Sequence, residues 1–88
     1  MKTLYRKRFL KELSKLSSDY RQTIENFIFN ELPEADTISE TGKLERLKGY
    51  PGYYKVRFGP YRLGLKLEGD TIILERVLHR RDIYKFFP

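Results

Sequence analysis

Residues 53–62 read Tyr-Tyr-Lys-Val-Arg-Phe-Gly-Pro-Tyr-Arg, and this stretch decides the fold because apolar side chains alternate on both sides of a turn. Every second side chain before Gly59 is apolar, and the same period of two resumes after Pro60. This period predicts β-strands at residues 53–58 and 61–68. Glycine accepts the positive φ that begins a type II′ turn, and proline tolerates the next position. We therefore predict a hairpin with Gly59-Pro60 as its loop.

The predicted hairpin has one apolar face and one cationic face. On the cationic face, this turn places Arg57 opposite Arg62, Lys55 opposite Gly64 and Tyr53 opposite Lys66. Like charges that lie directly opposite each other destabilise a sheet. A chain that concentrates cations in this way has a use for them, and we expect that use to be the binding of an anion.

Apolar residues before the hairpin follow a helical spacing. Stripes over residues 9–16, which include Leu10, and over residues 20–32 predict two amphipathic helices, with Pro33 ending the second. Either serine at positions 17 and 18 can cap that second helix. We interpret both stripes as core packing against the apolar face of the sheet. Residues 2–6 are predicted to form a short first strand.

A third strong strand is predicted at residues 71–78, after a tight turn at Gly69-Asp70. In this register Arg62 meets Val77, and Glu75 shares the basic face with Val77. Residues 83–87 suit a short C-terminal turn or helix packed against the sheet. Helices followed by hairpin-linked strands predict an α+β fold. We expect an N-terminal helical hairpin on a small twisted antiparallel sheet of about four strands, whose other face is open, concave and basic.

Length and composition restrict the class of protein. A chain of 88 residues predicts a single domain spanning residues 1–88. The absence of cysteine excludes disulfides and thiolate metal sites, and a single histidine argues against a histidine-based metal site. No cofactor or metal is predicted. No apolar run reaches membrane-spanning length and no signal peptide begins the chain, so we expect a cytoplasmic protein without a membrane partner.

The net charge of +6 comes entirely from the second half of the chain. Residues 1–42 carry seven basic and seven acidic side chains, whereas residues 43–88 carry eleven basic and five acidic ones. This asymmetry and a pI near 9.7 favour a polyanionic partner. Seven tyrosines add aromatic groups that can stack on bases.

Three segments, taken together, resemble the RelE/ParE superfamily of bacterial toxins. They are Leu44 with Leu47-Lys48-Gly49, Gly52-Tyr53-Tyr54-Lys55-Val56-Arg57 with Tyr61-Arg62-Leu63, and Val77-Leu78-His79-Arg80-Arg81-Asp82-Ile83-Tyr84. The resemblance covers nearly the whole chain and implies the fold predicted above. RelE-like members are messenger-RNA endoribonucleases that cut the codon in the ribosomal A site, and ParE-like members poison DNA gyrase. An antitoxin encoded beside each toxin neutralises it.

Five positions carry the resemblance to the RelE branch. Lys55 and Arg57 match its two basic positions on one strand, with arginine where some members have lysine. Arg62 matches the arginine of its Tyr-Arg-Leu strand. Arg80 matches the basic residue after the last strand, and Tyr84 matches the terminal tyrosine. The resemblance therefore implies that these residues form the catalytic site, with Tyr84 stacking on a base.

A second variant of the family is also represented. Residues 42–49 resemble the YoeB-like members, in which a glutamate of this stretch serves as base and a late histidine as acid. Glu45 and His79 are the matching residues. In the alternative interpretation, Glu45 is a surface partner of Lys43 or Lys48, and His79 is a structural residue at the end of a strand.

RNA cleavage by 2′-hydroxyl attack needs a base, a proton donor for the 5′-oxygen, cations around the phosphorane and bases held for in-line attack. Lys55 and Glu45 both remain candidates for the base. His79 is the candidate proton donor for the 5′-oxygen, because histidine is the side chain suited to proton transfer near neutral pH. Arg80 is the alternative, which would stabilise the leaving group as a cation. Additional RNA contacts are predicted for four residues: Tyr53, Arg46, Lys48 and Arg81.

These expectations add up to a toxin that is a ribosome-dependent, metal-independent messenger-RNA endoribonuclease. Its expected partners are a cognate antitoxin and the ribosome with messenger RNA in its A site. One alternative is a ParE-like toxin that poisons DNA gyrase without cutting RNA. Another is a basic RNA-binding module without catalysis, for which binding falls with salt while the RNA stays intact.

Overall fold

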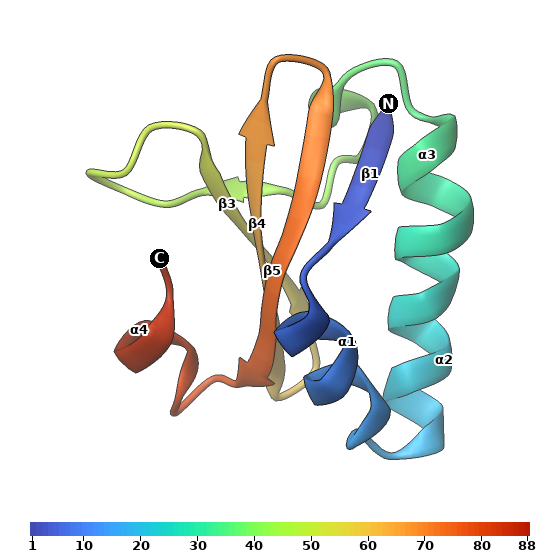
Figure 1. The fold of residues 1–88 in the computed structure, drawn as a ribbon, viewed down its shortest axis with the longest axis vertical. Helices are drawn as coiled ribbons and strands as arrows, with labels where there is room; N and C mark the ends of the chain where they lie inside the picture. Colours follow the sequence, from blue (N-terminus) through green and yellow to red (C-terminus); the bar gives the residue numbers. More distant parts are fainter.

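A computed structural model describes residues 1–88 and contains one five-stranded sheet with the strand order β1–β5–β4–β3–β2 (Figure 1). The strands are β1 (Lys2–Tyr5), β2 (Glu45–Arg46), β3 (Tyr53–Phe58), β4 (Tyr61–Glu68) and β5 (Thr71–His79). β1 pairs with β5 in parallel, and the other neighbours are antiparallel. The α+β class and the short first strand are confirmed. The prediction of an antiparallel sheet of about four strands was wrong. β1 lies at one edge and is parallel to β5, and the two-residue β2 adds a fifth strand at the other edge.

The hairpin of β3 and β4 has the predicted register. Lys55 lies opposite Gly64, and Arg57 lies opposite Arg62. Gly59 adopts a φ of 57°, as its position in the two-residue turn requires. Its hydrogen also leaves room for an aromatic ring, since a Cβ there would lie 2.5 Å from Cε1 of Tyr20. The turn therefore needs glycine for its backbone and for its packing.

One extra residue in β5 changes which side chains face the site. Leu65 pairs with Leu74, but the next residue of β4, Gly64, pairs with Arg76, so the ladder is shifted between them. Such a bulge moves every later side chain to the other face of the sheet. Arg62 consequently lies opposite Leu78 instead of Val77. The predicted placement of Val77 on the basic face was wrong, since that side chain is buried in the core.

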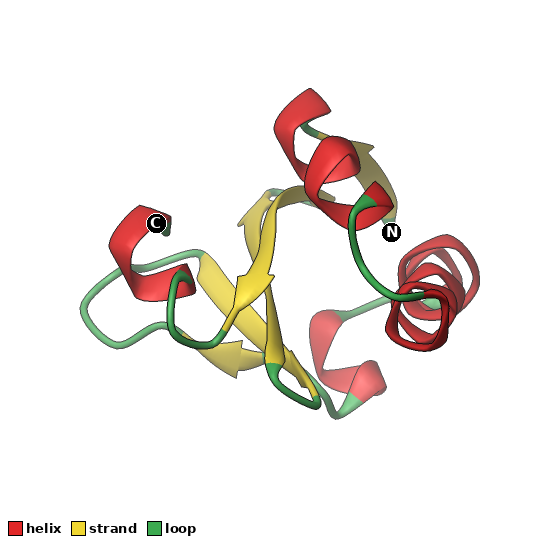
Figure 2. Cartoon of the chain, turned by 90° about the horizontal axis from the view of Figure 1, so that it is seen from below, coloured by secondary structure: helices red, strands yellow, loops and turns green.

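The helices lie on both sides of the sheet (Figure 2). They are α1 (Lys7–Ser14), α2 (Ser18–Asn26), a π-helical turn (Phe27–Glu31), α3 (Leu32–Glu34), a 3-10 turn (Ile38–Thr41) and α4 (Ile83–Phe86). Pro33 does not end the second helix, which continues to Glu34. A proline inside a helix lacks a donor and crowds the carbonyl four residues earlier. The wider π turn, in which the Leu32 N–H bonds to the Phe27 carbonyl, precedes the proline and accommodates it.

The helical hairpin covers the apolar face, as predicted. α1 and the continuous column from α2 to α3 pack side chains such as Phe9, Ile24 and Phe27 against the sheet. Leu10 departs from this pattern because it is exposed on α1. None of the helices has the length and apolar character of a membrane-spanning segment.

The opposite face is only partly open, because α4 and the C-terminal residues lie on it (Figures 1 and 2). Phe87 packs directly on Gly64, where a Cβ would lie 2.8 Å from the phenyl ring. Phe86 lies against the guanidinium of Arg76, 5.3 Å from the ring centroid. The predicted C-terminal helix packed against the sheet is therefore present, and it narrows the face predicted to be open.

Arg76 links the two sides of the molecule. It is almost buried, and its Nη2 lies 2.6 Å from a carboxylate oxygen of Glu12 on α1. Glu12 also accepts a hydrogen bond from the backbone N–H of Val77, at 3.1 Å. One carboxylate thus satisfies both the arginine and a backbone donor of β5 beyond the end of its pairing with β1.

Candidate functional site

Lys55 occupies the centre of the basic face. Its neighbours across the sheet are Glu45 on β2 and Gly64 on β4. Its ammonium donates a hydrogen bond to the hydroxyl of Tyr84 on α4, with 2.8 Å between Nζ and Oη. Lys55 and Tyr84 are 29 residues apart, yet the fold brings them into contact as the resemblance implies.

Glu45 joins the same cluster. One of its carboxylate oxygens lies 3.4 Å from Nε of Arg57. Lys55 is the cross-strand partner of Glu45, and Arg57 follows it by two residues on β3, on the same face. The alternative partner Lys43 binds Glu31 instead, at 3.0 Å. Both candidate bases, Glu45 and Lys55, therefore lie on the same exposed face as Arg57.

The two opposed arginines are directed away from each other. Arg62 donates through Nη1 to the carbonyls of Gly59 and Tyr61, at 2.8 and 3.0 Å, while Arg57 turns to Glu45. This arrangement offsets the repulsion expected from their direct pairing. Because a guanidinium has five N–H donors, each arginine keeps donors for a phosphate.

The bulge separates His79 from the cations. His79 pairs with Tyr61, and the two rings meet edge to face with centroids 5.9 Å apart. By strand alternation, His79 lies on the side of the sheet that α1 and α2 cover. Nδ1 of His79 accepts a hydrogen bond of 3.1 Å from the backbone N–H of Arg81. The structure therefore does not bring His79 together with Lys55 and Arg57.

Arg80 follows on the alternate side. Its backbone N–H donates to the carbonyl of Pro60 at 2.7 Å, which extends the β4–β5 pairing past the hairpin turn. Its guanidinium is exposed and has no hydrogen bond or ion pair with the rest of the chain. Arg81, by contrast, also directs its Nε toward His79.

The residues predicted to contact RNA are dispersed. Tyr53 is half-buried between Phe87 and the ammonium of Lys66, so it supports α4. Arg46 pairs with Tyr54 and therefore lies on the other face from Glu45. Lys48 is exposed on the loop after β2, beside the Lys55 site.

A separate ion pair flanks the basic face. Lys66 and Glu68 on β4 are 2.8 Å apart. The hydrogen bond to Glu68 and its charge raise the pKa of Lys66 above its ordinary value. The same contact lowers the pKa of Glu68. Lys66 is therefore engaged with Glu68.

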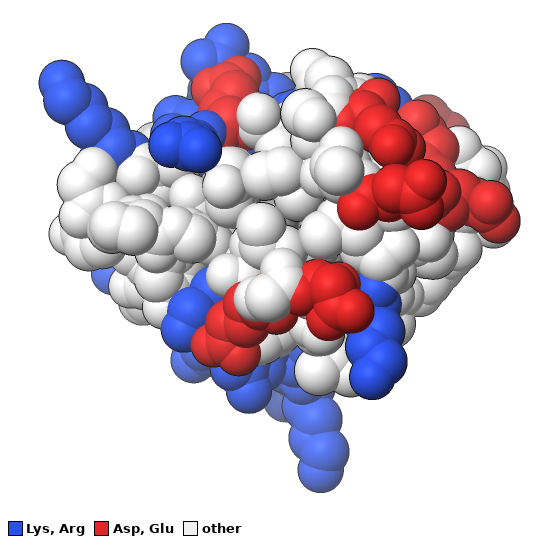
Figure 3. Space-filling view, turned by 90° about the horizontal axis from the view of Figure 1, so that it is seen from above, with Lys and Arg blue, Asp and Glu red and all other residues white.

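Several acidic side chains gather on one side of the molecule. In Figure 3 they form a cluster on the right, the side where α3 lies in Figure 1. Glu31, Glu34 and Glu40 line one hollow there. No group of three or more histidine or acidic side chains is arranged to hold a metal ion. This hollow is acidic, although Lys43 binds Glu31 there, and it contrasts with the basic face around Lys55.

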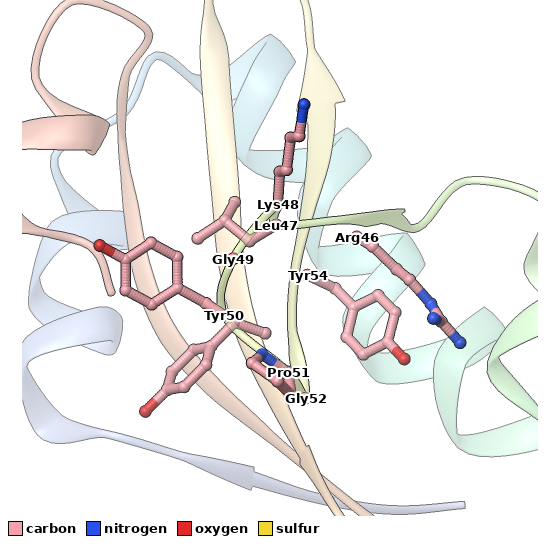
Figure 4. A pocket seen from close by; sticks show the side chains of 9 residues that line it. Arg46, Leu47, Lys48, Gly49, Tyr50, Pro51, Gly52 and Tyr54 are labelled. Atoms are coloured by element: carbon pink, nitrogen blue, oxygen red, sulfur yellow. The ribbon is translucent and has the colours of Figure 1, made fainter.

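The loop between β2 and β3 projects from the sheet and encloses a hollow of about 660 Å³ lined by residues 46–54 (Figures 1 and 4). A second hollow, of about 410 Å³, lies between this loop and α4. Its polar lining combines Lys48, Tyr50, Lys55, Tyr84 and Lys85. Sequence reasoning missed Tyr50 and Lys85, because nothing in their local pattern shows that the loop and α4 meet.

Comparison with known proteins identifies the family. The model of the ParE toxin of the type II toxin–antitoxin system, parDE, matches residues 4–84. The chain belongs to the RelE/ParE superfamily. Toxin RelE3 of Methanocaldococcus jannaschii is 39% identical over 89 residues, which cover all of both chains.

Solved structures of RelE toxins have the same fold. The toxin-antitoxin complex RelB-RelE from Methanococcus jannaschii matches with a TM-score of 0.80 and 37% identity, over 97% of this chain and 99% of that one. A free-state structure of a mutant Escherichia coli RelE matches with a TM-score of 0.72 and 21% identity, over 96% of this chain and 90% of that one. At this identity, the match shows only that the two chains share a fold. This protein is a RelE-like toxin of a type II toxin–antitoxin system. The resemblance predicted from the sequence is confirmed.

Proposed function

We propose that this toxin is a ribosome-dependent messenger-RNA endoribonuclease that cuts the codon in the A site without a metal ion. The observation that carries the proposal is the convergence of Glu45, Lys55, Arg57 and Tyr84 on one exposed face. These residues supply the base, the cations and the aromatic ring that RNA cleavage needs. The name of the M. jannaschii relative, Toxin RelE3, agrees with this branch of the superfamily.

The reaction begins with removal of the 2′-hydroxyl proton by Glu45 or by neutral Lys55. The 2′-oxygen then bonds to the adjacent phosphorus, the bond from phosphorus to the 5′-oxygen breaks, and the 5′-oxygen takes up a proton. A carboxylate is ionised at neutral pH and needs no tuning to act as the base. Lys55 is the second candidate for the same role, because it lies directly across the strand pair from Glu45 on the same face.

Arg57 and Arg62 stabilise the charge on the phosphorane through their free N–H donors. Arg80 assists the leaving oxygen, since its guanidinium is unpaired and follows the alternation that leads to the basic face. The proton for the 5′-oxygen comes from His79 or from water, since an arginine is a poor proton donor and Arg80 only stabilises the charge on that oxygen. The packing of His79 on Tyr61 makes it the weaker of these two proton sources. Tyr84 stacks on a base next to the scissile phosphate.

The decisive experiment is the cleavage of a defined messenger RNA by the purified chain, with and without programmed ribosomes and with and without EDTA. We expect cuts within the A-site codon only when ribosomes are present, and no effect of EDTA. A double variant, Lys55→Ala with Arg62→Ala, should be folded and inactive. Intact RNA from a folded chain free of antitoxin would overturn the proposal, and gyrase trapped on DNA by that chain would establish the ParE-like alternative.

We also propose that a cognate antitoxin binds this toxin. The solved M. jannaschii and E. coli relatives include complexes with RelB antitoxins. The proposed substrate, a translating ribosome with messenger RNA, further assigns the toxin to the cytoplasm. Co-expression with the product of the adjacent gene tests this: we expect a stable complex that does not cut ribosome-bound RNA, and a failure to co-purify would contradict it.

A further inference from the structure

The hollow between the β2–β3 loop and α4 has the chemistry of a binding site. Two large aromatic side chains reach it from opposite elements: Tyr50 on the loop is 52% exposed, and Tyr84 on α4 is 58% exposed. The ammonium of Lys55 lies over the Tyr84 ring, 5.2 Å from its centroid, but each half-exposed ring keeps surface on which a planar ligand can stack. Figure 1 shows the loop projecting from the sheet above α4, and the lining of the hollow takes one tyrosine from each of these segments.

Cations line the same hollow and acidic side chains do not. Lys48 contributes from the loop, Lys55 from β3 and Lys85 from α4. Leu47 and Phe87 add apolar surface, Phe87 being almost fully buried on the sheet. A planar ligand with negative charges around it satisfies this lining, which is the combination that single-stranded nucleic acid offers. An acidic peptide would use the cations but would leave the two exposed phenol rings without a planar partner.

The position of the hollow connects it to the reaction. Lys55 and Tyr84 belong both to this lining and to the proposed catalytic cluster. The hollow is therefore directly adjacent to the proposed cleavage site, and one RNA strand can occupy both. The volume of about 410 Å³ is sufficient for one nucleobase with part of its ribose phosphate.

We propose that this hollow, the Tyr50 cleft, holds one unstacked base of the substrate RNA between Tyr50 and Tyr84. Lys48 and Lys85 bind the phosphates that flank this base. The inference rests on the proposed endoribonuclease function and adds a second aromatic wall to it. Because stacking tolerates every base, Tyr50 contributes affinity and alignment more than a base code.

The test compares Tyr50→Ala with Tyr50→Phe in ribosome-dependent cleavage. Loss of one base–aromatic stack predicts a fall of about fivefold to 100-fold in kcat/KM, mostly through KM, for Tyr50→Ala. Tyr50→Phe keeps the ring and should stay near the wild type. Leu10→Ala, an exposed apolar truncation on α1, is the matched control and should change nothing.

A substrate change shows whether the ring acts on a base. Wild type and Tyr50→Ala are compared in cleavage of messages that carry an abasic nucleotide at each position of the codon in turn. When the missing base is the one that stacks on Tyr50, the two proteins should cleave equally, and at the other positions they should differ. An equal loss on all abasic messages would overturn the proposal and assign Tyr50 to a ribosome contact. Wild-type kinetics for Tyr50→Ala on the intact message would also overturn it, while leaving the proposed function in place.

A ribosome-free measurement separates this inference from the function on which it rests. A short oligonucleotide with 2-aminopurine in place of one base and deoxyribose at the scissile position cannot be cut, and stacking quenches its fluorescence. We expect quenching with the wild type and Tyr50→Phe, and a loss of quenching with Tyr50→Ala, even if no message is ever cleaved. Unchanged quenching by Tyr50→Ala, together with weaker capture of the antitoxin, would identify the loop as a protein-binding surface and overturn the proposal.

Discussion

The two faces of the sheet arise from the same alternation but are covered in different ways. The apolar face is closed by α1 and the column from α2 to α3, through a continuous core of fully buried side chains. The basic face is covered only by α4, through a few contacts: Phe87 on Gly64, Phe86 on Arg76, and Tyr84 with Lys55. The difference implies that stability depends mainly on the first face, whereas the second is free to serve a ligand.

The largest expected effect is the loss of activity caused by Lys55→Ala on the basic face. We expect cleavage to fall by about 100-fold or more, because the variant removes a candidate base or a cation of the phosphorane site. The free energy of unfolding should change by less than about 1 kcal/mol, since the side chain is partly exposed and its one hydrogen bond is to an exposed phenol. Single-turnover cleavage and urea unfolding measure the two effects, and a large loss of stability would mean that the basic face carries the fold.

The opposite result is expected from Leu63→Ala on the apolar face. Leu63 is fully buried, so its truncation should lower the free energy of unfolding by about 2–5 kcal/mol. Residual folded protein should cleave at the wild-type rate. Leu4→Ala is the matched control, because Leu4 is exposed and its truncation should cost little. An inactive but stable Leu63→Ala variant would refute the division of labour between the faces.

How far this division could be predicted depends on how local the cause is. The pairing of β3 with β4 follows from alternation and from the Gly59-Pro60 turn, so Arg57 opposite Arg62 was predictable. The bulge in β5 was not, because three successive apolar residues, Ile72, Ile73 and Leu74, hide the phase of the strand. The family resemblance assigned His79 to the catalytic site together with the cations, but the bulge turns it to the other side of the sheet.

Contacts between distant elements were the other gap. The pairing of β1 with β5 and the link from Glu12 to Arg76 join residues far apart in the chain, and no local pattern specifies them. The approach of Tyr84 to Lys55 was expected only through the family resemblance. Gly64 did offer a signal, since a glycine inside an apolar strand marks a close approach of another group. That group is Phe87.

A smaller effect is expected from Gly64→Ala, which tests how α4 is attached. Gly64 has no positive φ, so alanine is strained only by the ring of Phe87, 2.8 Å from the added Cβ. We expect α4 to shift, with a loss of about 1–3 kcal/mol in the free energy of unfolding and weaker cleavage through displaced Tyr84. The double variant with Phe87→Ala should recover part of the loss in stability, since the clash is gone. Additive losses in the double variant would contradict direct packing of the two residues.

The smallest expected effects on stability concern two ion pairs that residues of β5 form. Arg76→Ala should lower the free energy of unfolding by about 1–2 kcal/mol, because it leaves the partly buried carboxylate of Glu12 with only the Val77 N–H and removes the support of Phe86. Arg6→Ala, which breaks the more exposed pair with Glu75 at 3.3 Å, should cost about 0–1 kcal/mol and still less at high salt. Urea unfolding at low and high salt distinguishes them. If the cost of Arg76→Ala also disappears with salt, the pair with Glu12 contributes no more than a surface contact.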